Sequence, residues 1–222
     1  MNILTIECTH AALSAAVMKS SIVTEAKSSD WKKAVEALVP LIEEVMEGSR
    51  LKPQELKCIA VSSGPGSFTS LRIGMSVAKG IAYGLGIPLI PVPTLPAMAA
   101  SLTAEAGSVM AVIQARKGEY YYAAYFPDDL LSGLWHDGVH RGSAIEIISA
   151  VARANSVVVG RQLDELGPLL ADIGAIYAEA DFFSARSLFP AAERGYGTAV
   201  AAELDKVVPD YRQMFIPHVG RE

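Results

Sequence analysis

The sequence predicts an α/β protein with two related lobes, each built on a mixed sheet with flanking helices. A strand, a turn and a returning strand open the chain over residues 3–18, and a similar pattern opens its second half over residues 109–126. Between them, an apolar strand runs through a Gly-Pro-Gly turn into a long helix. A chain of 222 residues can bury about 70% of its unfolded surface, enough for one large domain or two small lobes. Two similar openings, one in each half, favour two lobes over one continuous sheet.

The first half begins with a predicted hairpin whose strands are residues 3–6 and 11–18. Apolar residues at helical spacing then predict a helix over residues 31–47. Pro40 lies in the interior of this helix and removes one backbone hydrogen bond, so we expect a kink there.

An apolar strand at residues 59–61 precedes the Gly-Pro-Gly turn and the long helix, which covers residues 68–84. Two prolines in residues 87–92 suit a short edge strand, because proline cannot donate to a sheet ladder. A helix over residues 94–102 closes this half.

The second half repeats the strand, turn and strand pattern and then continues with alternating helices and strands. We expect its opening strands at 109–115 and 120–126 and a loop over 127–142. The remaining predicted elements are helices at 145–153, 163–171 and 191–206 and strands at 156–159 and 175–178.

Small residues recur every four positions along the long helix, in two stripes. One stripe is Ser70, Gly74, Ala78 and Ala82, and the other is Ser76, Gly80 and Gly84. A glycine inside a helix costs about 1 kcal/mol relative to alanine, so these glycines need a packing reason. Small residues let neighbouring backbones approach closely, and we therefore interpret this helix as a contact element for another subunit.

Two cations on the same helix, Arg72 and Lys79, lie seven residues apart and share one face. With Phe68, Leu71 and Met75 beside them, they favour the border of a protein interface, since aromatic, Met and Arg residues are enriched in interface cores. The alternative is a pair of solvated cations.

The turn before the helix consists of Gly64, Pro65, Gly66 and Ser67. Its glycines allow a sharp reversal, and Ser67 can cap the helix. A helix amino terminus can also bind an anion, so an anion site is the alternative to a structural turn.

Glu7 and Gln114 occupy the turns of the two predicted hairpins. In a two-lobed phosphotransferase these turns carry acidic residues and glycine for phosphate and magnesium. Here one acidic residue is replaced by an amide, so we predict a degenerate ATP site with no cofactor, no metal and no catalytic residue. His136 and His140 match a metal-ligand spacing, and Ser76 and Lys79 match a nucleophile spacing, but their contexts favour solvated histidines and chance.

The bulk properties narrow the functional class. A net charge of −5 gives no electrostatic footprint for direct nucleic-acid binding. The two cysteines, Cys8 and Cys58, sit in apolar stretches without metal spacing and indicate buried thiols in a reducing compartment. We see no signal peptide and no apolar run long enough to cross a membrane, which predicts a cytoplasmic protein.

The chain resembles the bacterial TsaB (YeaZ) family, which takes part in making the threonylcarbamoyl modification of transfer RNA. The family motif GPGSFT-G-LRIG, followed by an AKG helix, is matched by residues 64–80, with Ser70 in place of the middle glycine. Residues 3–7, 114–119 and 209–212 extend the resemblance over nearly the full length.

The resemblance implies an ASKHA (actin, sugar kinase, Hsp70-like) fold, with an amino-terminal lobe at residues 1–103 and a carboxyl-terminal lobe at 104–222, whose last helix can pack back on the first lobe. It also implies a non-catalytic subunit that pairs with a catalytic paralogue, TsaD, and is joined by a small ATPase, TsaE. That assembly transfers a threonylcarbamoyl group from its adenylate to N6 of the adenosine beside the anticodon. Transfer RNA is then a partner of the complex and not of this chain alone.

The pairing is implied to use helices 31–46 and 68–84. The interface residues that we predict are Trp31, Val35, Leu38, Phe68, Leu71, Arg72, Gly74, Met75, Ala78, Lys79 and Ala82. Without the paralogue, the same patch is expected to drive homodimerisation. We expect Gly74→Leu to abolish pairing and to leave the monomer folded.

The chain also departs from the family pattern. The family usually has Asp at the position of Glu7 and Asp-Ala-Arg at residues 114–116, which weakens any nucleotide or metal role here. The alternative function is a different class, an active ASKHA-type phosphotransferase or an M22-like metallohydrolase. Tight Mg-ATP binding with turnover would indicate the first, and a stoichiometric metal lost on His136→Ala would indicate the second.

Overall fold

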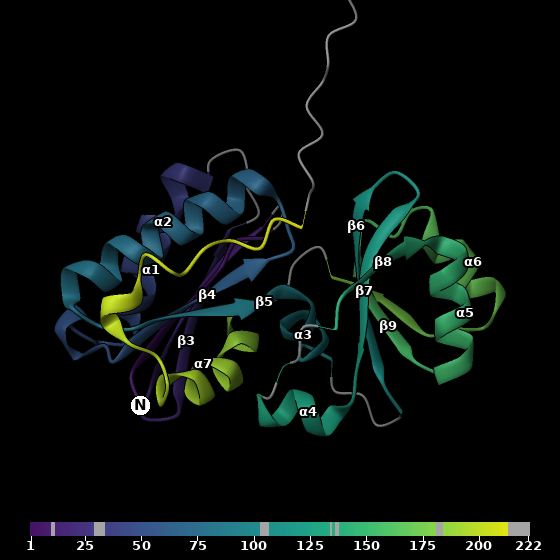
Figure 1. The fold of residues 1–222 in the computed structure, drawn as a ribbon. Helices are drawn as coiled ribbons and strands as arrows, with labels where there is room; N and C mark the ends of the chain where they lie inside the picture. Colours follow the sequence, from purple (N-terminus) through teal and green to yellow (C-terminus); the bar gives the residue numbers. More distant parts are fainter. Residues whose placement is uncertain are drawn as a thin grey trace, which may run out of the picture.

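The computed structural model describes residues 1–9, 12–28, 34–102, 107–133, 135, 138–180 and 184–212, and only the backbone at positions 34 and 35. The amino-terminal lobe holds a five-stranded sheet in the order β3-β2-β1-β4-β5 (Figure 1). β1 pairs antiparallel with β2 and parallel with β4, so the sheet is mixed, as predicted. The strand bounds are β1 (Ile3–Glu7), β2 (Leu13–Lys19), β3 (Ile22–Ser28), β4 (Cys58–Gly64) and β5 (Leu89–Pro93).

The carboxyl-terminal lobe repeats this topology in a second five-stranded sheet, with the order β10-β9-β6-β7-β8. β6 pairs antiparallel with β7 and parallel with β9, as β1 does with β2 and β4. The prediction of two related lobes with mixed sheets is therefore confirmed. The strand bounds are β6 (Val109–Arg116), β7 (Glu119–Tyr125), β8 (His140–Ser143), β9 (Val157–Arg161) and β10 (Tyr177–Glu179).

Helices occupy equivalent connections in the two lobes. α1 (Ala34–Gly48) and α2 (Phe68–Leu85) precede and follow β4, and α5 (Ala144–Ala154) and α6 (Leu166–Asp172) precede and follow β9. The remaining helices are α3 (Thr94–Ala99), α4 (Pro127–Ser132), α7 (Phe189–Tyr196) and three short 3₁₀ turns, η2 (Pro53–Glu55), η3 (Ala185–Leu188) and η4 (Ala201–Glu203). α1 continues through Pro40, and the expected kink stays a prediction.

Three parts of the element prediction were wrong. β3 was not predicted, and the expected loop at 127–142 contains α4 and part of β8. The expected helix over 191–206 is shorter, because α7 ends at Tyr196, before Gly197, and a 3₁₀ turn follows at Ala201–Glu203. Glycine weakens a helix, and the alanines beyond Gly197 do not restore it.

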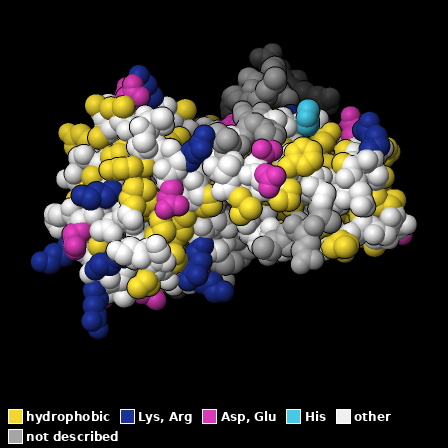
Figure 2. Space-filling view, turned by 90° about the horizontal axis from the view of Figure 1, so that it is seen from below, with side chains coloured by type: hydrophobic (Ala, Val, Ile, Leu, Met, Phe, Trp, Pro, Cys, Tyr) yellow, Lys and Arg dark blue, Asp and Glu magenta, His cyan; other side chains and the backbone are white. Residues whose placement is uncertain are grey.

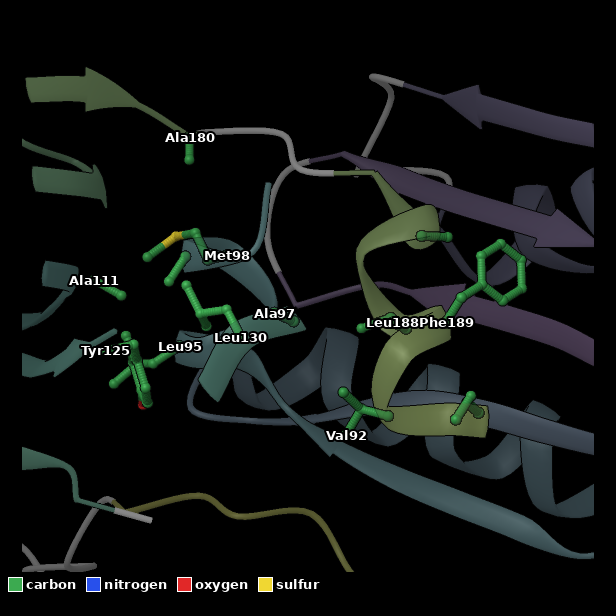
Figure 3. Close-up of a cluster of buried hydrophobic side chains, with 14 of the residues drawn as sticks. Val92, Leu95, Ala97, Met98, Ala111, Tyr125, Leu130, Ala180, Leu188 and Phe189 are labelled. Carbon is green, nitrogen blue, oxygen red and sulfur yellow. The ribbon is translucent and has the colours of Figure 1, made fainter. Parts of the chain in front are cut away.

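Alternate residues along the strands divide the interior into three layers, since successive side chains of a strand point to opposite faces. The outer face of the first sheet packs on α1 and α2 through Leu4, Ile6 and Ile59, and the outer face of the second packs on α5 and α6 through Val112 and Val158. The inner faces of both sheets share one cluster, drawn in part in Figure 3.

That central cluster surrounds α3, whose six residues are all buried. Leu95 and Met98 of α3 join Val92 of the first sheet and Ala111 of the second in the cluster (Figure 3). η3 and α7 return to the first lobe. The Ala185 amide donates to the Ser14 Oγ atom at 3.1 Å, so residues placed by sequence in the second lobe pack on the first. On the face seen from below, hydrophobic side chains are interspersed with charged ones over both lobes (Figure 2).

Candidate functional site

The turn before α2 is held by bonds within the chain. The Gly64 amide donates to the Thr94 Oγ1 atom at 3.2 Å, and the Ser67 amide donates to the Thr9 carbonyl oxygen at 2.8 Å. Ser67 caps α2, since its Oγ atom accepts from the Ser70 amide at 3.5 Å, as predicted. Two of the turn amides thus have protein acceptors, which favours the structural interpretation of the turn over an anion site.

The first small-residue stripe of α2 faces the sheet of its own lobe. A Cβ atom added at Gly74 would overlap the Cys8 Sγ atom, and it would lie 3.7 Å from the Val61 Cγ2 atom. The Cys8 thiol donates to the Ser70 carbonyl oxygen at 3.3 Å. The small residues of this stripe therefore let β1 and β4 approach the helix.

This placement corrects part of the predicted interface. Six of its residues are buried within the first lobe: Leu38, Leu71, Gly74, Met75, Ala78 and Ala82. Because these residues are enclosed by the protein's own core, they do not line a surface open to a partner. Because an added side chain at Gly74 would meet Cys8 inside the lobe, we now expect Gly74→Leu to disturb the fold of the monomer itself.

The second stripe lies on the opposite, open side of α2. Added Cβ atoms at Gly80 and Gly84 would meet no heavy atom within 4 Å. Ser76 is exposed, and Tyr83 beside it is 82% exposed. We call Ser76, Gly80, Tyr83 and Gly84 the open stripe. It offers small residues and one large exposed ring, which suits close approach by another helix.

The other predicted interface residues have mixed surroundings. Phe68 and Arg72 are exposed at the start of α2, and Lys79 is half-buried. Trp31 lies outside the described residues, and so does the side chain of Val35. Sequence reasoning placed all of them on one interface, and the described ones border the open side of α2.

The segment Pro209–Arg212 lies across the start of α2, which the sequence did not indicate. The Tyr211 ring centroid is 4.7 Å from that of Phe68, and the Arg72 Nε atom donates to the Tyr211 hydroxyl at 3.1 Å. The Asp210 amide donates to the Ser63 carbonyl oxygen at 2.7 Å. The Tyr121 hydroxyl of the second lobe donates to the Arg212 carbonyl oxygen at 2.7 Å. This segment therefore connects the turn of the first lobe to the sheet of the second.

A buried ion pair joins the two lobes at the carboxyl ends of β1 and β9. The Arg161 Nη2 atom lies 3.3 Å from the Glu7 Oε1 atom, and the two side chains are 1% and 2% exposed. Arg161 also donates from Nη1 to the Thr9 Oγ1 atom at 2.7 Å and from Nε to the Ala180 carbonyl oxygen at 3.1 Å. The Glu7 Oε1 atom accepts from the Thr9 amide at 2.8 Å.

A cavity of about 210 Å³ lies above this pair, between the lobes. It is lined by Arg161, Gln114 and Tyr121 and by the turn and start of α2. Of the two residues predicted in phosphate turns, Gln114 faces this cavity, whereas the Glu7 carboxylate is engaged by Arg161. The sequence analysis missed Arg161. The sequence feature that could have indicated it is an arginine directly after the apolar residues 157–160.

The remaining candidate residues are two histidines and two cysteines. His140 is exposed on β8, with its ring centroid 5.6 Å from that of Tyr122, and His136 lies outside the described residues. Both cysteines are free and buried. Burial, assisted by the Glu7 charge, raises the pKa of the Cys8 thiol far above its usual range, and burial raises the pKa of the Cys58 thiol to about 12. Within the described ranges, no three His, Cys, Asp or Glu side chains gather as metal ligands would. Nor does any described helix have the length and apolarity needed to span a bilayer.

The repeated β-β-β-α-β-α-β order and the cleft between the lobes define a protein of the ASKHA fold. Two solved structures share the fold over nearly the full chain. One is titled "YeaZ from Pseudomonas aeruginosa" and covers 95% of this chain and 99% of its own, with a TM-score of 0.74 and 20% identity. The other, described as an uncharacterized protein with similarity to peptidase YEAZ from Pseudomonas aeruginosa, has a TM-score of 0.76 and 19% identity, and covers 96% of this chain and 99% of its own.

Sequence comparison identifies relatives. Residues 28–129 match the family described as "TsaD: tRNA N6-adenosine threonylcarbamoyltransferase". The chain is 33% identical over 138 residues to the "tRNA threonylcarbamoyladenosine biosynthesis protein TsaB" of Escherichia coli, covering 61% of this chain and 59% of that protein. It is 32% identical over 127 residues to the Bacillus subtilis protein of the same description, covering 56% and 55%. The matches thus span little more than half the length of these relatives. The chain is therefore similar to proteins described as TsaB and YeaZ.

Proposed function

We propose that this chain is a non-catalytic scaffold subunit of the assembly that forms N6-threonylcarbamoyladenosine in transfer RNA. It pairs with a catalytic paralogue of the TsaD type, and an ATPase of the TsaE type joins them in the cytoplasm. Transfer RNA meets the assembly as a whole. When the paralogue is absent, a second copy of the chain takes its place.

The observation that carries the proposal is the open stripe on α2. Gly80 and Gly84 weaken the helix by about 1 kcal/mol each relative to alanine, and among the residues that the structure describes no neighbour explains them. Glycine at an exposed helix position has a packing use when a second backbone approaches it. Tyr83 adds a large exposed ring of the kind enriched in interface cores.

The ion pair between Arg161 and Glu7, next to the cavity between the lobes, supports a non-catalytic role. The Arg161 guanidinium contacts the carboxylate that would otherwise face the cleft. A fixed positive charge at that place repels a metal cation, and it already engages the Glu7 Oε1 atom. The chemistry of the assembly then falls to the paralogue.

Gly80→Leu tests the pairing. The new side chain projects into open space, so the monomer keeps its fold, and it occupies the volume that the partner helix needs. Overpacking of about 1–3 kcal/mol corresponds to pairing that is about 5–150-fold weaker. Sedimentation velocity with the TsaD-type paralogue measures the loss, and circular dichroism checks the fold.

Gly197→Leu is the matched control. Gly197 also has negative φ and open space around its Cβ position, but it lies at the end of α7. This variant is expected to pair as the unmodified chain does. Equal pairing of Gly80→Leu and Gly197→Leu would refute the proposed interface.

The catalytic role is tested separately in a reconstituted assembly. We expect threonylcarbamoyl transfer to transfer RNA only when this chain, the paralogue and the ATPase are mixed. We also expect Gly80→Leu to lose that activity with the pairing. Transfer by this chain alone would refute the non-catalytic role, and turnover of Mg-ATP by it alone would favour the phosphotransferase alternative.

A further inference from the structure

The ion pair between Arg161 and Glu7 connects the two lobes to each other. It joins Glu7 of β1 in the first sheet to Arg161 of β9 in the second. These two residues are 154 positions apart in the sequence. Three donor atoms of Arg161 point in different directions, to Glu7, Thr9 and Ala180. A guanidinium held at three points fixes orientation as well as distance, because its donors are planar and rigid.

The other described contacts between the sheets' inner faces are mainly apolar and run through α3. Apolar burial is non-directional, so it holds the lobes together without specifying one angle between them. α3 is a short helix of six residues at the crossing between the lobes, which suits a hinge. The ion pair lies at the carboxyl ends of β1 and β9.

We propose that Arg161 is an internal latch, which holds the two lobes at one closed angle without any ligand in the cleft. The guanidinium bridges both lobes, as a bound ligand would in a cleft that closes on it. The latch therefore presents α2 in a fixed position relative to the second lobe. This inference goes beyond the proposed pairing, since it concerns motion between the lobes of the single chain.

The segment Pro209–Arg212 adds a second tie on the same side of the cleft. Two of its bonds, from Asp210 to Ser63 and from Tyr121 to Arg212, use backbone atoms of the segment, and the Tyr211 hydroxyl accepts a further bond from Arg72. The Arg212 side chain is engaged by Asp210 at 2.6 Å within the segment itself. The segment is therefore attached to both lobes by hydrogen bonds of its backbone, whereas the Arg161 latch is a buried ion pair.

The experiment compares single and double variants. Arg161→Met and Glu7→Leu each leave one buried charge without its partner, so each lowers the urea midpoint. Glu7→Leu combined with Arg161→Met removes both charges, so it recovers part of the midpoint because no unpaired charge remains. The loss that persists comes from the Thr9 amide and the Ala180 carbonyl oxygen, which lose these partners. The double variant thus removes the ion pair between the lobes without leaving an unpaired buried charge, so its effect on lobe motion can be measured in a folded chain.

Lobe motion is measured by pulsed electron-electron distance spectroscopy. Spin labels are attached through Glu47→Cys on α1 and Ala152→Cys on α5, both exposed. The native thiols are buried and remain unlabelled. We expect one narrow distance for the unmodified chain, with or without Mg-ATP, and a broad distribution for the double variant.

An unchanged narrow distribution in a folded double variant would overturn the latch. If the double variant does not fold, Arg161→Lys is measured in the same way, since it keeps the charge but replaces three donor nitrogens in a rigid plane with one flexible ammonium. A broadened distribution for Arg161→Lys supports the latch, and a narrow one overturns it. Pairing with the paralogue is recorded in parallel, so a failed latch and a failed scaffold proposal give different results.

Discussion

Gly74→Ala perturbs the contact that decides which side of α2 faces the core. The new Cβ atom would overlap the Cys8 Sγ atom, which is fully buried. Overpacking of this kind costs about 1–3 kcal/mol. Replacing a helical glycine with alanine returns about 1 kcal/mol, so the expected net change is a loss of about 0–2 kcal/mol in the free energy of unfolding.

The same substitution has the opposite sign when the sulfur is absent. In a Cys8→Ala background, the nearest remaining atom of residue 8 is its Cβ, 3.4 Å from the added methyl group, which is ordinary contact. Gly74→Ala should then stabilise the chain by about 1 kcal/mol. The coupling energy between positions 8 and 74 is therefore about 1–3 kcal/mol, the overpacking term alone.

Urea unfolding of the four chains in this cycle measures the coupling, provided the m-value is unchanged. Gly80→Ala is the control, because its Cβ meets no atom within 4 Å and it should stabilise both backgrounds equally. If Gly74→Ala changes the unfolding free energy by the same amount with and without the Cys8 sulfur, the contact between α2 and β1 is not as described.

Two further predictions concern the thiols and the cap of α5. Because burial raises the pKa of both thiols, they stay protonated in the folded chain. Their contribution to stability is complete below the unfolded pKa of about 9 and is lost as pH rises towards the folded value, about 12 for Cys58. The urea midpoint should therefore fall between pH 8 and pH 10, and iodoacetamide should modify Cys8 and Cys58 only after unfolding. Ser143 and Glu146 form a capping box, with the Glu146 Oε2 atom accepting from the Ser143 amide at 2.7 Å. Ser143→Ala should cost about 0.5–2 kcal/mol by thermal unfolding, and an unchanged midpoint would contradict the cap.

Local sequence patterns predicted many of the helices, strands and turns correctly. Strand and helix periodicity placed α2, the turn at Gly64 and the two hairpins, because these depend on residues near one another in the chain. It failed for β3, whose side chains are mostly partly exposed at a sheet edge, and for α4, a single turn inside a glycine-rich stretch. Short elements carry few periods, so their pattern is weak.

The candidate site was predicted only in part. Both small-residue stripes of α2 were visible in the sequence, but their spacing is the same, so the pattern could not say which one the sheet covers. Gly74 turned out to face Cys8, and Gly80 to face open space. Packing within the lobe therefore decides which side of the helix stays open, and it is this open side that we propose for pairing.

The amino-acid sequence by itself determined the repeated α/β pattern and the capped long helix, because each depends on residues that are close together in the chain. Tertiary structure alone decided that Arg161 meets Glu7 and that Tyr211 covers Phe68, contacts between residues far apart in the chain. Such contacts depend on how two sheets are placed around α3. That placement is set by the summed burial of the central core, and no local pattern records it.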